Sequence, residues 1–261
     1  WSLEQINPYN PCLQADNWTA SQDFKGGTPG GINSVYDDIY VEAGIIGACV
    51  ADSQRIRLEF NQSLGTDFTL YPGIFSIDHD AGPVEAILPE DPWFTSFILY
   101  PAHKLKPGIT YSLECKGHIR NCLGDSVLIS QSVELGLPEE PETGDLVINE
   151  VLFNPFPGGS DYVELYNRSG KAVSLTGLRL ASISDRAPAP PDTSICTIED
   201  RCRVLLPGEY ALLCENFTGV DNYYLCSENV MVAEPEGFPS YSNEAGMVLI
   251  MDAGMGVIDR F

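Results

Sequence analysis

The hydrophobic and polar positions of this chain alternate in short segments, a pattern that predicts β-strands along most of its length. The clearest example is in residues 145–167, where a mainly apolar stretch from Leu146 to Phe153 and an alternating stretch from Val163 to Tyr166 flank the loop Asn154 to Gly159. A period of two is typical of a half-buried strand, and the prolines and glycines of the loop favour turns. We therefore predict two strands joined by a proline-rich loop.

Residues 39–136 carry the same pattern, with six or seven short apolar segments separated by turns and strict alternation from Arg55 to Phe60. Strands at this spacing are typical of an Ig-like β-sandwich. Residues 137–144 are acidic and contain proline, so we expect a linker there before strands resume in residues 145–261. The predicted fold class is all-β, with two Ig-like β-sandwich domains joined by a short acidic linker.

The first 38 residues differ from the rest, because they contain few apolar residues and the turn-rich run Gly26 to Gly31. Folding requires enough buried apolar surface to offset the lost entropy of the chain. We expect this segment to pack on another part of the protein or to be disordered. Because the chain opens at Trp1 without a signal peptide, we also expect it to be part of a longer protein.

The charge balance excludes several classes of partner. The chain of 261 residues has 14 lysines and arginines against 37 aspartates and glutamates, a net charge of −23. Nucleic acids and anionic membrane surfaces both attract clustered basic residues, so neither is an expected partner. No apolar run is long enough to span a bilayer, so we expect no direct membrane insertion. A solvated acidic surface explains the charge most simply, and binding of divalent cations is the alternative.

Motifs for catalysis are not found in the sequence. It has no G-x-S-x-G elbow and no glycine-rich phosphate loop before a helix, and its three histidines share no metal-ligand spacing. We therefore predict that the chain is not an enzyme and has no cofactor, with calcium as the one ion to consider.

The cysteines indicate the compartment. Six of the eight form three short-range couples, Cys115 with Cys122, Cys196 with Cys202, and Cys214 with Cys226. No C-x-x-C occurs, which argues against zinc, and an even number of cysteines favours disulfides and an oxidising compartment. Reduced structural thiols are the alternative, and Cys12 and Cys49 have no assigned partner.

Carboxylates at loop ends are the candidates for a calcium site, because calcium takes six to eight oxygen ligands. The candidates lie beside the 154–159 loop and at the start of the 39–136 segment: Asp161, Glu164, Asp37, Asp38 and Glu42. Solvated carboxylates are the simpler interpretation, since no EF-hand pattern occurs.

Aromatic residues near loops are candidates for binding a sugar or a protein partner. Trp93 and Phe94 follow the turn at Asp91 and Pro92 and could stack on a ligand. Trp93 also precedes an apolar strand, so a core-facing orientation is the alternative that we favour.

The order of several segments resembles the lamin tail domain of secreted bacterial multidomain proteins over residues 145–261. The segments that carry this resemblance are INEVLFNP, SDYVELYN, Val173 to Leu180, Leu206 to Tyr210, Leu249 to Asp252 and Val257 to Phe261. Residues 39–136 resemble a bacterial Ig-like domain through RLEFNQSL, LKPGITYSLECKG and the Asn121 to Gly124 turn. These resemblances imply an extracellular or periplasmic position on a bacterial cell surface.

The N-terminal segment is similar to the end of a lamin tail domain, through Ser2 to Ile6, Asn17 to Thr19 and Gly27 to Ser34, with Gln5 in place of the usual arginine. The resemblance implies that residues 1–38 end one such domain and that residues 145–261 lack the closing strands of another. An open sandwich exposes strand edges. We therefore expect residues 1–34 to complete the 145–261 sandwich by strand addition, within one molecule or between two.

The resemblance and the lack of catalytic motifs together predict a non-catalytic surface protein. Its expected role is structural spacing and interaction with a protein or a glycan at the cell surface. The alternative is that these are accessory domains of a secreted nuclease or glycosidase whose catalytic domain lies outside this sequence.

Overall fold

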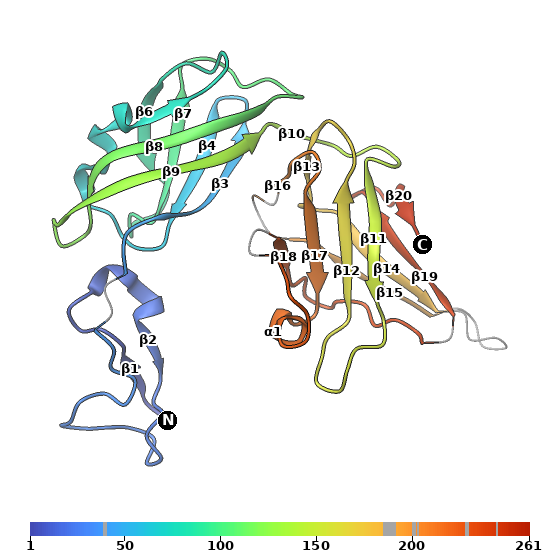
Figure 1. The fold of residues 1–261 in the computed structure, drawn as a ribbon, viewed down its shortest axis with the longest axis horizontal. Helices are drawn as coiled ribbons and strands as arrows, with labels where there is room; N and C mark the ends of the chain where they lie inside the picture. Colours follow the sequence, from blue (N-terminus) through green and yellow to red (C-terminus); the bar gives the residue numbers. More distant parts are fainter. Residues whose placement is uncertain (39–40, 185–191, 200–201, 203, 228–229, 244) are drawn as a thin grey trace. The chain divides into compact units, whose positions relative to one another are not determined.

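The computed structural model describes residues 1–38, 41–184, 192–199, 202, 204–227, 230–243 and 245–261. These residues form many β-strands in several sheets and only a few short helices, so the predicted all-β sandwich class is confirmed (Figure 1). The chain divides into two compact units, residues 1–105 with 111–135 and residues 106–110 with 136–261. Among the described residues, no helix is both long and apolar enough to cross a membrane.

The first unit begins with two short antiparallel strands, β1 (Leu3–Gln5) and β2 (Trp18–Ala20), separated by a 3-10 helix at Pro11–Asn17. A buried asparagine holds this segment together. The Asn17 side chain donates to the carbonyl oxygens of Asn7 at 2.7 Å and Asn10 at 3.0 Å, and it accepts from the Asn7 N–H at 2.7 Å. Backbone groups that would otherwise be unsatisfied are therefore paired.

A buried carboxylate has the same organising role. Glu4 accepts hydrogen bonds from the Thr28 hydroxyl at 2.8 Å and from both the N–H and the hydroxyl of Ser34 at 2.7 Å. Burial alone would raise the pKa of Glu4, but these donors outweigh it and lower the pKa to about 2. The segment that has too few apolar residues for a core is thus ordered by polar contacts.

β1 and β2 pair with each other and, among the described strands, with no strand of residues 145–261. The addition of residues 1–34 to the 145–261 sandwich therefore stays a prediction.

The rest of the first unit is a sandwich of two sheets with the strand orders β3-β4-β7-β6 and β5-β8-β9. Its strands are β3 (Ile45–Asp52), β4 (Arg55–Phe60), β5 (Phe75–Ile77), β6 (Val84–Pro89), β7 (Ser96–Pro101), β8 (Thr110–Arg120) and β9 (Ser126–Gly136). Short 3-10 helices occupy Thr66–Leu70 and Pro72–Ile74. The alternation predicted for Arg55 to Phe60 is confirmed, because every second residue, starting at Ile56, is buried.

Edge-to-face aromatic contacts fill this core. The Phe60 ring lies 5.4 Å from that of Phe68 and 5.9 Å from that of Phe97, both nearly perpendicular to it. Such geometry adds about 0.5–1.5 kcal/mol per pair to the gain from apolar burial.

A disulfide between Cys12 and Cys122 ties the N-terminal segment to the end of β8, across 110 residues of sequence. The predicted couple of Cys115 and Cys122 is wrong. Cys115 lies within β8 with its side chain in the core, and the six extended residues from Cys115 to Arg120 alone span about 16 Å. A disulfide needs Cα atoms only about 4.4–6.8 Å apart.

The other two predicted couples are also wrong. Cys196 and both members of the Cys214 and Cys226 couple are free thiols, whereas Cys202 takes part in a disulfide, as does Cys49. Cys196 is buried in the core of the second unit, and burial raises the pKa of its thiol to about 11. The short spacings in the sequence do not determine which cysteines pair, because pairing depends on which faces of the strands the side chains occupy.

The second unit packs two four-stranded sheets, β11-β12-β17-β18 and β15-β14-β19-β20, against each other, with a small third sheet, β10-β13-β16 (Figure 1). The strands of the first sheet are β11 (Leu146–Leu152), β12 (Tyr162–Asn167), β17 (Tyr210–Cys214) and β18 (Met231–Ala233). Those of the second are β14 (Arg179–Ser184), β15 (Asp192–Thr197), β19 (Gly246–Met251) and β20 (Val257–Arg260). The third contains β10 (Pro138–Glu139), β13 (Ala172–Ser174) and β16 (Val204–Leu205), and the helix α1 covers Phe217–Asp221.

The two strands predicted around the Asn154 to Gly159 loop are confirmed as β11 and β12, which pair antiparallel with a register shift between Ile148 and Glu150. The segment predicted as a linker, residues 137–144, contains a short strand, because Pro138 and Glu139 pair with β13. Its apolar-poor composition concealed this pairing, which needs only backbone groups.

The last strand, β20, does not leave its outer side open. The Ile258 carbonyl accepts from the Gly144 N–H at 2.9 Å, and the Asp259 carboxylate accepts from the Ile148 N–H at 2.8 Å. Residues before and within β11 thus cover part of the strand edge that residues 145–261 were expected to leave open.

We predict that removing the Cys12–Cys122 disulfide, by Cys12→Ala with Cys122→Ala, lowers the stability of the first unit by about 2–5 kcal/mol. The cross-link restricts the unfolded chain over a long loop, and the N-terminal segment has few apolar contacts to replace it. Hydrogen exchange should show lost protection of β1 and β2 and unchanged protection of β11 and β12. Equal loss in both units would contradict this assignment.

We also predict that Gly136→Ala destabilises the second unit by about 1–3 kcal/mol, the usual cost of overpacking. A Cβ at this position would clash with the Cβ of Ala172 and lie 3.0 Å from a methyl carbon of Leu206. Gly170→Ala is the matched control, since its Cβ would meet open space. Calorimetry should show a lower melting temperature for Gly136→Ala alone, and equal behaviour of the two variants would refute the packing argument.

Candidate functional site

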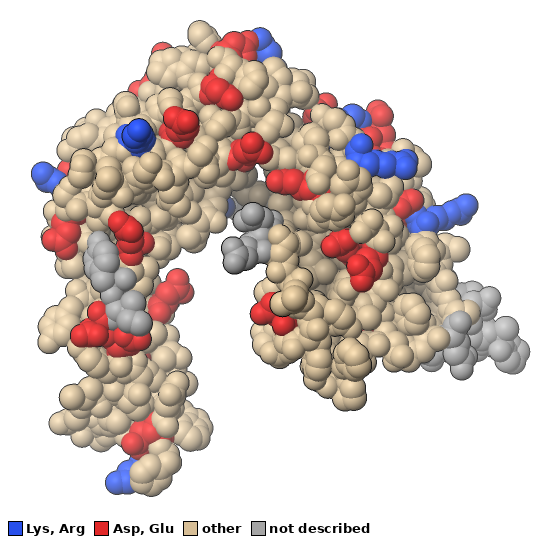
Figure 2. Space-filling model, viewed as in Figure 1, with Lys and Arg blue, Asp and Glu red and all other residues tan. Residues whose placement is uncertain are grey.

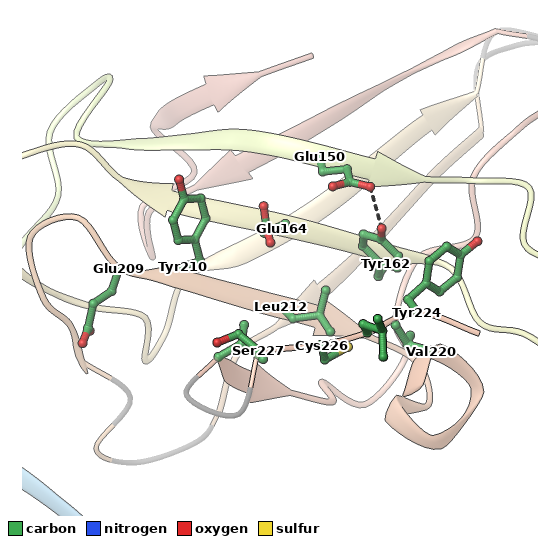
Figure 3. A pocket seen from close by; sticks show the side chains of 12 residues that line it. Glu150, Tyr162, Glu164, Glu209, Tyr210, Leu212, Val220, Tyr224, Cys226 and Ser227 are labelled. Carbon is green, nitrogen blue, oxygen red and sulfur yellow. Dashed lines mark hydrogen bonds between the residues drawn. The ribbon is translucent and has the colours of Figure 1, made fainter. Parts of the chain in front are cut away.

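The outer face of the β11-β12-β17-β18 sheet carries a groove of about 670 Å³ (Figure 3). Alternation along the strands builds its floor. On β12, Val163 and Leu165 enter the core, so Tyr162 and Glu164 face outward, and on β17 the outward side chains are Tyr210 and Leu212. The strand pleat thus gives this sheet an apolar inner face and an aromatic, acidic outer face.

A second wall of the groove comes from α1 and the segment that follows it. Asn216 caps α1 by accepting a hydrogen bond from the Gly219 N–H at 3.2 Å. Val220, Tyr224, Leu225 and Cys226 line this side. Leu225 is fully exposed, and such an apolar side chain at the rim of a groove is available for contact with a partner.

Tyrosine rings stand at both ends of the groove. Tyr210, 44% exposed, stacks on Tyr166 with ring centroids 4.7 Å apart and planes inclined by 33°. At the other end Tyr162 meets Tyr224 edge to face, with centroids 5.9 Å apart. The rings are therefore held in fixed orientations by neighbouring rings rather than left free in solvent.

Three carboxylates share the groove with these rings: Glu150, Glu164 and Glu209. Glu150 accepts a hydrogen bond from the Tyr162 hydroxyl at 2.6 Å, and the two side chains point toward one another in Figure 3. Glu164 accepts from the Asn149 amide at 2.6 Å. Burial and the hydrogen bond to Glu150 both raise the pKa of Tyr162, so its hydroxyl stays protonated and donating.

The two cysteine thiols of this region are poor nucleophiles, because burial favours their protonated form. Cys214 lies at the end of β17 in the small apolar cluster beneath the groove, and burial raises its pKa to about 12. Cys226 packs against the same cluster, and burial raises its pKa as well. The protonated thiol is a poor nucleophile, so these cysteines serve as apolar packing.

The calcium candidates are not brought together. Asp161 and Glu164 are three residues apart, and Glu164 faces the groove whereas Asp161 lies near Tyr241 and Glu215. Asp37, Asp38 and Glu42 are exposed side chains. Within the described parts of the chain, no three histidine, cysteine, aspartate or glutamate side chains are grouped so as to hold a metal ion.

Trp93 and Phe94 lie in a turn of the first unit, and the core-facing orientation favoured for Trp93 is wrong, since 62% of its surface is exposed. Both line a second concave surface, together with Gln14 and Arg120. Phe94 has a positive φ of 58°, and the centroid of its ring lies 6.3 Å from that of Phe97, whereas the Trp93 side chain faces solvent. Their role in ligand binding stays a prediction.

Sequence reasoning missed the aromatic groove. The alternation of Tyr162, Glu164 and Tyr166 was visible in the sequence as a strand pattern. The residues of the second wall follow about fifty positions later, and only the pairing of β12 with β17 brings them to the same face.

Comparisons with known proteins support the assignment of the second unit. Residues 139–261 match the family model of the Lamin Tail Domain, which confirms the resemblance stated for residues 145–261. The comparisons do not show a bacterial Ig-like domain in residues 39–136, so that assignment stays a prediction. No curated protein matches the chain.

Solved structures resemble the chain only weakly. The N-terminal part of the bacterial S-layer protein SbsC has 14% identity and a TM-score of 0.34, over 63% of this chain and 42% of that one. A longer S-layer structure, rSbsC, has 11% identity and a TM-score of 0.34, over 83% and 40%. Native alpha-2-macroglobulin from Escherichia coli, spanning domains MG0-NIE-MG1, has 10% identity and a TM-score of 0.30, over 82% and 79%. The chain thus spans about two fifths of the S-layer structures, and these scores carry no conclusion on function.

We predict that Asp161→Asn raises the melting temperature of the second unit at neutral pH. Burial and the nearby Glu215 raise the pKa of Asp161, and the hydrogen bond from the Tyr241 backbone only partly opposes them. A carboxyl with a raised folded-state pKa contributes stability at low pH that is lost as pH rises through that pKa. The gain of the variant should therefore vanish below the ordinary aspartate pKa, about 3.9.

Calorimetry of both proteins between acidic and neutral pH measures this effect, with the exposed Asp192→Asn as the control for overall charge. The same comparison in EDTA and in calcium distinguishes the burial argument from the hypothesis that Asp161 binds a cation. A calcium-dependent loss of stability in Asp161→Asn would contradict the burial argument and indicate a bound ion.

Proposed function

We propose that this chain is a non-catalytic module of an extracellular bacterial surface protein, which spaces neighbouring domains and binds a protein or glycan partner. The observation that carries the proposal is the groove on the second unit. It combines oriented tyrosine rings, a fully exposed leucine and carboxylates on one rigid sheet. Aromatic side chains with polar neighbours are the residue types that dominate binding energy at recognition surfaces.

The cysteines support the proposed extracellular location. Cys12 and Cys122 are joined, and Cys49 and Cys202 also take part in disulfides. Disulfides persist in secreted and surface proteins and are rare in the reducing cytosol. A charge of −23 further suits a protein that must stay soluble outside the cell.

The proposed spacing role is supported by the division of the chain into two compact units, each with a buried core. A β-sandwich keeps its shape without a ligand, because its core is buried between two sheets. The unit that carries the groove is therefore a stable support on which a binding surface can be presented to a partner.

The test is a binding panel on the full chain, with immobilised glycans of neutral and charged types and peptides of defined charge. We expect at least one ligand to be retained by the wild type and weakened at least about fivefold in Leu225→Ser and Tyr210→Ala, since the few residues that dominate a binding surface each contribute about 1 kcal/mol or more. Ile195→Ser is the matched control, an exposed apolar residue on β15 of the other sheet. The proposal would be overturned if neither groove variant weakened the binding of any retained ligand.

A further inference from the structure

The groove on the second unit is negatively charged without compensation. Glu150, Glu164 and Glu209 each accept one hydrogen bond, from Tyr162, Asn149 and the Leu206 N–H. In each case the second carboxylate oxygen has no hydrogen-bond partner among the described residues. No lysine, arginine or histidine in the described chain forms an ion pair with any of the three, although other carboxylates such as Asp145 do have basic partners.

Two of these carboxylates oppose each other. Glu150 and Glu164 are direct cross-strand partners in the antiparallel pairing of β11 and β12. Like charges directly opposite on one face of a sheet are destabilising. A positive group that enters between them removes this repulsion, so the groove favours a cationic ligand over a neutral or an anionic one.

The aromatic rings favour the same chemistry. Tyr210 follows Glu209 in sequence, and Tyr162 shares a hydrogen bond with Glu150. A cation over the face of an aromatic ring is attracted by its quadrupole, and arginine can stack its planar guanidinium on a ring while it forks to a carboxylate. A groove that places tyrosine ring faces beside carboxylates therefore suits arginine better than lysine.

The spacing of the groove indicates an extended ligand. Tyr162 and Glu164 are alternate residues of β12, and Tyr166, which packs against its cross-strand neighbour Tyr210, is the next on that face. Alternate side chains of a strand lie about 6.8 Å apart. An extended peptide repeats its side chains on one side at the same interval, so its residues two apart would meet successive rings and carboxylates.

We infer that the groove binds an extended basic segment of a partner protein, with arginine side chains two residues apart seated among its tyrosines and glutamates. This inference rests on the proposed function, for which it names the ligand class. Leu225 at the rim would contact the apolar side chains between the arginines or beside them.

General attraction is the competing explanation. Acidic side chains are spread over the visible surface of both units and basic ones are few, so any basic peptide will be drawn to this protein (Figure 2). Such attraction depends on the number of charges and falls with salt, but it does not depend on which carboxylate is removed or on the order of residues in the peptide.

The experiment measures the affinity of the full chain for a labelled peptide of alternating arginine and threonine. Comparison peptides are its lysine analogue, its glutamate analogue and a peptide of the same composition with all the arginines in one block. Glu164→Gln and Tyr210→Ala are the groove variants, and Glu140→Gln, an exposed carboxylate outside the groove, is the matched charge control. Melting curves confirm that each variant is folded.

We expect Glu164→Gln and Tyr210→Ala to weaken binding of the alternating peptide at least about fivefold, because each removes a charge-assisted or aromatic contact. Glu140→Gln should change it less than twofold, and the block peptide and the lysine analogue should bind more weakly than the alternating one. Equal effects of Glu164→Gln and Glu140→Gln, or equal binding of the alternating and block peptides, would overturn the inference. A neutral glycan or uncharged peptide whose binding depends on Tyr210 would overturn it too, while leaving the proposed function standing.

Discussion

The period-two alternation of side chains along β12 is the constraint on which both the core and the groove of the second unit depend. Val163 and Leu165 are completely buried between the sheets, and this fixes Tyr162 and Glu164 on the opposite face. A shift of one residue would exchange the two sets, exposing the apolar pair and burying a carboxylate. The groove is therefore a geometric consequence of the same pattern that folds the domain.

Magnitudes explain why the sheet tolerates two opposing carboxylates. Burial of Val163 and Leu165 contributes about 1.5–3 kcal/mol for each side chain. Cross-strand side-chain pairs contribute only about 0.2–1 kcal/mol each, and the repulsion between Glu150 and Glu164 is limited further because both have access to solvent. Packing thus fixes the register, and the charge pattern on the outer face has little influence on it.

Sequence reasoning succeeded where a structure depends on neighbours in the chain. The alternation in Arg55 to Phe60 and the turn-rich loop Asn154 to Gly159 both follow local rules. The strand β4 and the hairpin of β11 and β12 were therefore predicted correctly. It failed for Cys122, whose partner Cys12 is 110 residues away, because pairing of cysteines depends on three-dimensional proximity. Part of the candidate site, the outward face of β12, could be predicted from the local alternation of side chains. The other wall around α1 depends on a strand pairing that no local pattern specifies.

The N-terminal segment and the groove use buried or constrained carboxylates in opposite ways. Glu4 is surrounded by the donors of Thr28 and Ser34, which satisfy it within the fold and lower its pKa. Glu150 and Glu164 each receive a single donor, which orients the carboxylate but leaves one oxygen available. Orientation before binding reduces the side-chain entropy that a ligand must immobilise. Carboxylates that are held in place yet incompletely satisfied are therefore the arrangement expected of a recognition surface, whereas a purely structural carboxylate has the surroundings of Glu4.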